Sequence, residues 1–161
     1  MLYDRDCGFC RWSLAQLLGL DRAGRLQPVP LGTEKATNLL AELTEDERAA
    51  SWHLVSPDGA RWSAGSAAPP LLRLLRGGRL PAALLDQAPN LTERAYRWVA
   101  DHRSTFSKLI PDAAKRRADA RISRAERAPD WAAEAAPAPR AEPDDRPPSQ
   151  AASSAGSFVS R

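Results

Sequence analysis

Histidine and cysteine are scarce in this sequence, with two of each among 161 residues. The histidines, His53 and His102, have no ligand-like spacing to each other or to the cysteines. Because a structural zinc site ordinarily needs four such ligands, the sequence predicts no bound metal. We expect no organic cofactor either.

Long apolar runs are also missing. No stretch approaches the roughly 18 apolar residues that a membrane-spanning helix needs, and no charged-then-apolar signal segment comes before residue 4. The sequence therefore predicts no membrane span and a cytoplasmic, reducing location. In such a compartment a cysteine pair is more often catalytic or metal-binding than structural.

The chain has no strong excess of charge of either sign. Its net charge is +3, and the basic residues of the folded part are dispersed. The one basic run, Lys115-Arg116-Arg117, could contact nucleic acid or anionic lipid, but we interpret it as a solvated helix face. We expect no nucleic-acid partner.

Both cysteines lie in one segment near the start of the chain, Asp4-Arg5-Asp6-Cys7-Gly8-Phe9-Cys10. Leu2-Tyr3 before this segment is typical of the end of a strand. After it, apolar side chains recur with the period of one helix face, at Cys10, Leu14, Leu17 and Leu18. The sequence therefore predicts a strand, a tight turn and a helix, with Cys7 at or just before the helix N-terminus and Cys10 in its first turn.

This placement favours redox chemistry. A helix N-terminus offers unpaired N–H groups and about half a positive charge, which together stabilise a thiolate. At a spacing of three, two cysteine sulfurs are close enough for a disulfide. We expect Cys7 to attack as a thiolate and Cys10 to resolve the mixed disulfide. Gly8 is expected to keep the approach to Cys7 open, and Phe9 to cover one flank.

Charged neighbours act on Cys7 in both directions. Arg5 and Arg11 favour the thiolate, whereas Asp4 and Asp6 oppose it if they stay ionised. We therefore expect a thiol less acidified than that of the strongest oxidants.

Two other interpretations of the pair stay open. Cysteines at this spacing are common zinc ligands, but completing a site would need His53 and His102. The cysteines could also be buried and inert. The strand-turn-helix context favours the redox interpretation over both.

The segment resembles the signature of the DCC family of thiol-disulfide oxidoreductases, which is named for the three residues Asp4, Cys7 and Cys10. Tyr3 before the signature, the turn at residues 57–59 and the segment at residues 96–103 are also similar to that family, and the resemblance covers about residues 1–111. It implies a thioredoxin-like fold, with Cys7 and Cys10 as the redox pair. Thioredoxin-like proteins usually carry a cis-proline before the third strand, but residues 47–51 contain no proline.

The remaining strands follow from local patterns. Residues 25–31 indicate a second strand, placed at a sheet edge because Pro28 and Pro30 cannot donate to a ladder. Residues 52–56 and 60–64 predict a β-hairpin around the turn residues Pro57-Asp58-Gly59. Together these elements predict an α/β fold with a small mixed sheet of about four strands, flanked by helices.

Helices are expected after Thr33, after Thr44 with its capping-box partner Glu47, from Ser66 to Gly77, and over residues 80–85. The longest helix of the domain is predicted to start at Asn90, with a buried stripe of Leu91, Ala95, Trp98, Val99 and His102. Tyr96 and Arg103 lie on a neighbouring face. We interpret Tyr96 as core, Arg103 as paired with a carboxylate and His102 as a packed or surface residue; the alternative is that Tyr96 and Arg103 contact a partner or the redox site.

The chain divides into three predicted parts. Residues 1–111 form the thioredoxin-like domain, residues 112–127 a charged, helical extension with almost nothing to bury, and residues 128–161 a disordered tail rich in Ala, Pro and Ser. Truncation at a point between residues 111 and 127 is therefore expected to leave thermal stability and thiol reactivity unchanged.

Only Met1, Leu2 and Tyr3 precede Asp4, and a central strand this short leads us to expect several apolar residues in front of Met1.

These observations predict a thiol-disulfide oxidoreductase that uses Cys7 and Cys10, supported by Asp4, Asp6, Gly8, Phe9 and Arg11. Its expected partners are a disulfide-containing protein or a small thiol substrate and an unidentified electron donor. A second enzyme hypothesis is a peroxide-responsive thiol, in which Cys7 becomes a sulfenic acid and Cys10 closes the disulfide. A non-enzyme hypothesis is an interaction module whose cysteines are structural.

Overall fold

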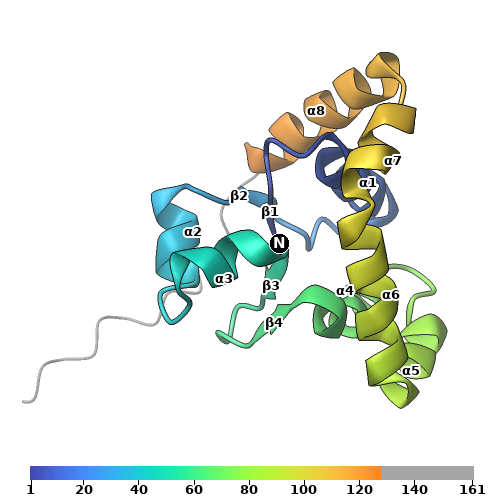
Figure 1. The fold of residues 1–161 in the computed structure, drawn as a ribbon. Helices are drawn as coiled ribbons and strands as arrows, with labels where there is room; N and C mark the ends of the chain where they lie inside the picture. Colours follow the sequence, from blue (N-terminus) through green and yellow to red (C-terminus); the bar gives the residue numbers. More distant parts are fainter. Residues whose placement is uncertain (128–161) are drawn as a thin grey trace, which may run out of the picture.

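The computed structural model describes residues 1–127 and contains a four-stranded sheet in the order β2-β1-β3-β4 (Figure 1). Strand β1 (Leu2–Tyr3) runs parallel to β2 (Val29–Pro30) and antiparallel to β3 (His53–Val55). Strand β4 (Arg61–Ser63) completes the sheet as the antiparallel partner of β3. The predicted mixed α/β fold with about four strands is confirmed, and it is consistent with a thioredoxin-like arrangement.

Helices surround this sheet. The described helices are α1 (Gly8–Leu20), α2 (Glu34–Leu39), α3 (Glu45–Ala50), the 3₁₀ helix η1 (Ala64–Ala67), α4 (Ala68–Leu74), α5 (Arg79–Gln87), α6 (Pro89–Asp101), α7 (Arg103–Leu109) and α8 (Asp112–Glu126). Within residues 1–127, none of them has the length and apolar character needed to cross a bilayer.

The two strands nearest the redox segment are short. Strand β2 lies at the sheet edge as predicted, but it covers only Val29–Pro30 of the expected 25–31. Strand β1 is central, and its two residues are buried. Pairing nevertheless continues past its ends, because the backbone oxygens of Met1 and Tyr3 accept hydrogen bonds from Val29 and Leu31 at 2.9 Å. The expected short central strand is confirmed.

The hairpin between β3 and β4 also matches its prediction. His53 pairs with Ser63, and Val55 with Arg61. Gly59 has a φ of 85°, a left-handed value that favours glycine, and its N–H donates to the Ser56 carbonyl at 3.0 Å. Thr33 and Thr44 cap α2 and α3 as expected, and Thr44 forms the predicted capping box with Glu47.

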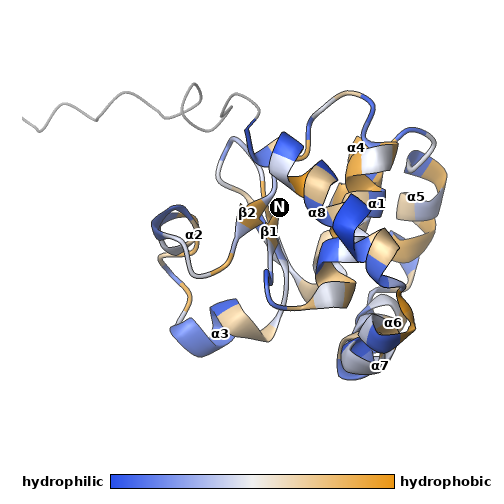
Figure 2. Cartoon of the chain, turned by 90° about the horizontal axis from the view of Figure 1, so that it is seen from above, coloured by the Kyte–Doolittle hydropathy of each residue, from blue (hydrophilic) through white to orange (hydrophobic). Residues whose placement is uncertain are grey.

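Helix α8 corrects an expectation. Residues 112–127 were expected to bury almost nothing, yet Ala118 and Ile122 are buried in one cluster with Tyr3, Leu14 and Ala15. Figures 1 and 2 show α8 lying beside α1. Alanines account for the error, because such small side chains give a weak sequence signal but let two helices approach closely. The boundary at residue 111 stays a prediction, and the proposed tail at residues 128–161 lies outside the described residues.

The region before α6 corrects another expectation. The helix was expected to begin at Ser66, but Ser66 lies within η1, where its Oγ donates to the Ser63 carbonyl at 2.6 Å. Helix α4 begins at Ala68. In η1, a Cβ on Gly65 would lie 2.7 Å from the Glu93 Cα. The glycine therefore lets the backbone of α6 pack directly on η1.

This crossing determines which face of α6 is buried. The predicted stripe is wrong, because Leu91 is 66% exposed and Trp98 is 57% exposed. Thr92 is buried instead, and Tyr96 and Val99 are half-buried. Helix α6 has 13 residues, the same as α1, so it is not longer than every other helix of residues 1–111, as was expected.

Packing of α8 gives a first prediction. Ile122 is 3% exposed, and its replacement by alanine removes buried apolar atoms and leaves a cavity. We expect Ile122→Ala to lower the free energy of unfolding by about 2–5 kcal/mol in denaturant titrations. Leu109→Ala is the matched control, because Leu109 is 73% exposed. Equal stability of Ile122→Ala and the wild type would mean that α8 does not contribute to the core.

His53 gives a second prediction. This side chain is 1% exposed, with Nε2 3.0 Å from the Arg48 carbonyl and Nδ1 2.7 Å from Ser63 Oγ. Because a carbonyl only accepts, Nε2 carries a proton, and in the neutral ring Nδ1 accepts from the Ser63 hydroxyl. Burial lowers the pKa of His53 below its ordinary value.

A lowered histidine pKa makes the unfolded chain bind more protons than the folded chain below about pH 6.5. The stability contributed by His53 is therefore present above that pH and is lost as the pH falls, by at most about 1.4 kcal/mol per pH unit. Burial lowers the pKa of the Met1 amino group to about 5, which acts in the same direction. Unfolding curves at pH 7.5 and 5.5 should therefore show a smaller pH effect in His53→Gln than in the wild type, and no such reduction in the exposed His102→Gln.

Candidate functional site

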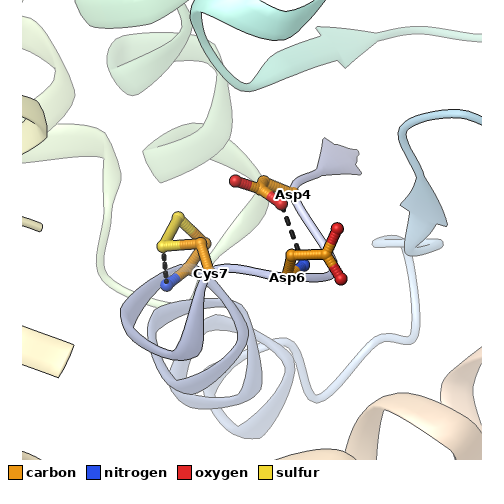
Figure 3. The surroundings of a disulfide bond; sticks show 4 residues. Asp4, Asp6 and Cys7 are labelled. Atoms are coloured by element: carbon orange, nitrogen blue, oxygen red, sulfur yellow. Dashed lines mark hydrogen bonds between the residues drawn. A yellow bond between two sulfur atoms is a disulfide. The ribbon is translucent and has the colours of Figure 1, made fainter. Parts of the chain in front are cut away.

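The two cysteines are joined by a disulfide at the N-terminus of α1, with their Cα atoms 5.2 Å apart. Cys7 is the N-cap residue in an extended conformation, and Cys10 lies in the first turn, as predicted. The Cys10 backbone N–H donates to Cys7 Sγ at 3.2 Å (Figure 3). A reduced Cys7 would therefore sit where helix N–H groups stabilise a negative charge.

Asp4 and Asp6 are placed differently with respect to this disulfide. A carboxylate oxygen of Asp4 and the two sulfurs all lie within 4.8 Å of one another. Asp4 Oδ1 also accepts the Asp6 backbone N–H at 2.9 Å, whereas the exposed Asp6 carboxylate points away from the sulfurs (Figure 3). Only Asp4 therefore has a carboxylate beside the cysteines.

Asp4, Cys7 and Cys10 could also hold a thiophilic metal ion after reduction of the disulfide. The three groups are half-buried, and no fourth Cys, His, Asp or Glu of residues 1–127 joins their cluster. A structural zinc site ordinarily has four protein ligands. The set is therefore incomplete for structural zinc, and the absence of stoichiometric metal stays a prediction.

The other predicted support residues contact helices α7 and α8. A Cβ on Gly8 would lie 2.5 Å from Ser107 Oγ, so this glycine makes room for α7; the open approach to Cys7 stays a prediction. The ring of Phe9 packs against those of Trp12 and Phe106, with centroids 6.3 and 5.2 Å away. Phe9 therefore packs against α1 and α7, and its role in covering one flank of Cys7 stays a prediction.

The two arginines of the segment pair with carboxylates of α8. Arg5 lies 3.4 Å from Glu126, and Arg11 lies 3.4 Å from Asp119. The Tyr3 hydroxyl also donates to Glu126, at 3.0 Å. The effect of Arg5 and Arg11 on a thiolate stays a prediction, and these ion pairs reduce the positive charge that either side chain offers to the sulfur.

A cavity of about 230 Å³ opens beside Cys10 and not beside Cys7. Its walls come from β1, α1, the segment before β3, α6 and α7, and most of its lining is apolar. The polar or charged residues that line it are Asp4, Ser13, Ser51, Tyr96 and Arg103. We call this space the Cys10 cavity.

Tyr96 and Arg103 line this cavity together, as the alternative interpretation of these residues expected. Burial raises the pKa of Tyr96, while the Trp52 backbone and the Arg103 charge oppose the shift. Arg103 forms no ion pair with a carboxylate of residues 1–127, so its predicted pairing is wrong for the described chain. His102 is exposed, in agreement with its interpretation as a surface residue.

Ser13, Ser51 and Trp52 are among the cavity residues that sequence reasoning did not assign to the site. Ser13 had a usable signal, because it lies three residues after Cys10 and therefore on the same helix face. Ser51 and Trp52 come just before β3, where thioredoxin-like proteins usually carry a cis-proline; residues 1–127 contain no cis peptide bond. Ser51 is extended there and borders the cavity directly.

Comparison with known proteins gives one family. The family described as DCC1-like thiol-disulfide oxidoreductase matches residues 1–109. No curated protein and no solved structure matches the chain. The matched range contains the disulfide and every wall of the Cys10 cavity, and it ends just before α8.

Proposed function

The chain belongs to the DCC1-like thiol-disulfide oxidoreductase family, and on this premise we propose that it catalyses thiol–disulfide exchange with Cys7 as the attacking thiolate and Cys10 as the resolving thiol. The observation that carries the assignment is the hydrogen bond from the Cys10 N–H to Cys7 Sγ. It distinguishes the two sulfurs, because it supports negative charge on Cys7 specifically.

In the first step, the Cys7 thiolate attacks one sulfur of a substrate disulfide. A Cys7–substrate bond forms, the substrate disulfide breaks, and the other substrate sulfur leaves with the electron pair and takes up a proton. The substrate is a disulfide-containing protein or a small disulfide. Cys7 is half-buried and does not line the Cys10 cavity, so we assign the approach of a large substrate to the other side of the disulfide.

In the second step, Cys10 attacks Cys7 Sγ, the mixed disulfide breaks, and the substrate leaves as a second thiol. Cys10 must lose its proton to attack, and we assign this proton to the Asp4 carboxylate, which lies within 4.8 Å of its sulfur. The substrate gains two electrons, and the enzyme ends with the Cys7–Cys10 disulfide. A cytoplasmic location, expected from the sequence, belongs to this proposal.

The assignment of roles predicts an order of alkylation. When the fully reduced protein is treated briefly with iodoacetamide near pH 7, Cys7 should be labelled before Cys10, because its thiolate receives the N–H hydrogen bond. Peptide mass analysis over time measures both rates. Cys7→Ser and Cys10→Ser serve as single-thiol references. Faster labelling of Cys10 would reverse the roles assigned here.

The role of Asp4 predicts opposite effects on the two steps. Asp4→Asn keeps an acceptor for the Asp6 N–H but removes the charge beside the sulfurs, so alkylation of Cys7 should become faster at neutral pH. Resolution of a preformed Cys7 mixed disulfide should become slower, by about 10²-fold or more, because the proton acceptor is lost. Stopped-flow release of an aromatic thiol from Cys7 measures this step.

Asp6→Asn is the matched control for both measurements, because the Asp6 carboxylate points away from the disulfide. It should leave both rates near those of the wild type. If Asp4→Asn releases the aromatic thiol as fast as the wild type, then Asp4 is not the proton acceptor for Cys10. The two-cysteine mechanism would then need another base.

A further inference from the structure

The Cys10 cavity is too small for a folded segment of a protein substrate. Its volume of about 230 Å³ lies below the roughly 300–1,000 Å³ of pockets for drug-sized ligands. Leu14, Leu17, Trp52, Val99 and Ala100 give it mainly apolar walls. Its size and lining therefore suit a small molecule with an apolar body.

Two charged residues line this cavity from different elements. Asp4 comes from the end of β1, beside the cysteine sulfurs, and Arg103 comes from the first residue of α7. Arg103 has no carboxylate partner within residues 1–127, so its guanidinium is available to an anion. A carboxylate on an apolar stem would form an ion pair with Arg103. The negative charge of Asp4 disfavours a second anionic group near the disulfide.

We propose that the Cys10 cavity binds the electron donor, and that this donor is a small dithiol with an apolar stem and a terminal carboxylate. The inference rests on the proposed oxidoreductase function and adds the chemical class of the reductant. The donor meets the disulfide at Cys10, the cysteine that lines the cavity, while protein substrates react at Cys7.

The exchange balances in two steps. One donor thiolate attacks Cys10 Sγ, a donor–Cys10 bond forms, and the Cys7–Cys10 bond breaks with its electron pair on Cys7. The second donor thiolate then attacks the donor sulfur bound to Cys10, which closes a cyclic disulfide and releases Cys10. The donor loses two electrons and two thiol protons, and the two cysteines take them up.

The geometry favours attack on Cys10 because of the group that leaves. Attack at Cys10 expels Cys7, whose sulfur already accepts the Cys10 N–H at 3.2 Å. A sulfur that carries negative charge well leaves faster in thiol–disulfide exchange. Attack at Cys7 would instead expel Cys10, for which no N–H donor to the sulfur is present among the described hydrogen bonds.

Three dithiol probes test the proposal on the oxidised full-length protein: dihydrolipoate, its neutral amide dihydrolipoamide, and dithiothreitol. Rate constants for disulfide reduction are measured by acid quench, alkylation and mass analysis. We expect dihydrolipoate to react about fivefold faster than dihydrolipoamide, as one ion pair at a partly exposed arginine allows. Arg103→Met should remove this difference, with the dithiothreitol rate of the same variant as the internal reference.

Arg97→Met is the matched control, because Arg97 lies on α6, is mostly exposed and does not line the cavity. It should keep the preference for dihydrolipoate. Equal rates with dihydrolipoate and its amide in the wild type, or a preference that survives Arg103→Met, would overturn the proposed donor class. In that case, reduction by all three dithiols would still support the oxidoreductase.

The site of attack is tested separately with 8-mercaptooctanoate, a monothiol that shares the apolar stem and carboxylate but cannot form a ring. Peptide mapping after an early acid quench should place its adduct on Cys10 and leave Cys7 free. An adduct on Cys7 would overturn the inference. If no probe reduces the protein faster than it reduces a disulfide-closed peptide of residues 4–13, the proposed function fails together with the inference.

Discussion

The hydrogen bond from the Cys10 N–H to Cys7 Sγ depends on where α1 begins, and packing on several sides fixes that point. Leu14 and Ala15 of α1 are buried in the same cluster as Tyr3 at the end of β1 and the small or branched side chains of α8. An N-cap side chain accepts an N–H of the first turn, so a helix that began one residue later would take Cys7 out of the cap position and remove this hydrogen bond. The chemistry of the cysteines therefore depends on a core whose nearest members lie four residues or more away.

A second group of contacts brings α6 and α7 to the same turn. Gly65 lets η1 pack against the backbone of α6 at Glu93, and the Gly65 N–H donates to the Glu93 carboxylate at 3.0 Å. Further along, the ring of Phe106 on α7 packs against that of Phe9. Helix α6 is therefore held at Glu93 and helix α7 at Phe106. Arg103 is the first residue of α7 and lies between these two points in the sequence. The position of Arg103 beside the Cys10 cavity thus follows from packing that involves neither cysteine.

Local patterns in the sequence predicted the elements that carry the site. The features that these patterns missed depend on packing between residues far apart in the sequence. The Cys7–Cys10 spacing, the turn at Gly59 and the caps at Thr33 and Thr44 each depend on a few neighbouring residues, and the structure confirms them. The buried face of α6 depends instead on its crossing with η1, and the docking of α8 depends on alanines and a single isoleucine. Neither is visible in a periodicity, because α6 exposes Leu91 and Trp98 and α8 has few large apolar residues. The Cys10 cavity was missed for the same reason, since its walls come from segments about 100 residues apart.

The charges around the disulfide suggest why these distant contacts matter for the chemistry. The helix N-terminus stabilises a Cys7 thiolate, and free arginines at positions 5 and 11 would add to that effect. Both arginines instead pair with carboxylates of α8, while the Asp4 carboxylate lies beside the sulfurs. A thiol that is too acidic is a poor nucleophile, and exchange is fastest when its acidity is close to ambient pH. By occupying Arg5 and Arg11, α8 leaves the helix terminus and Asp4 as the two opposing influences on Cys7, which favours a balanced thiol over a strongly acidified one.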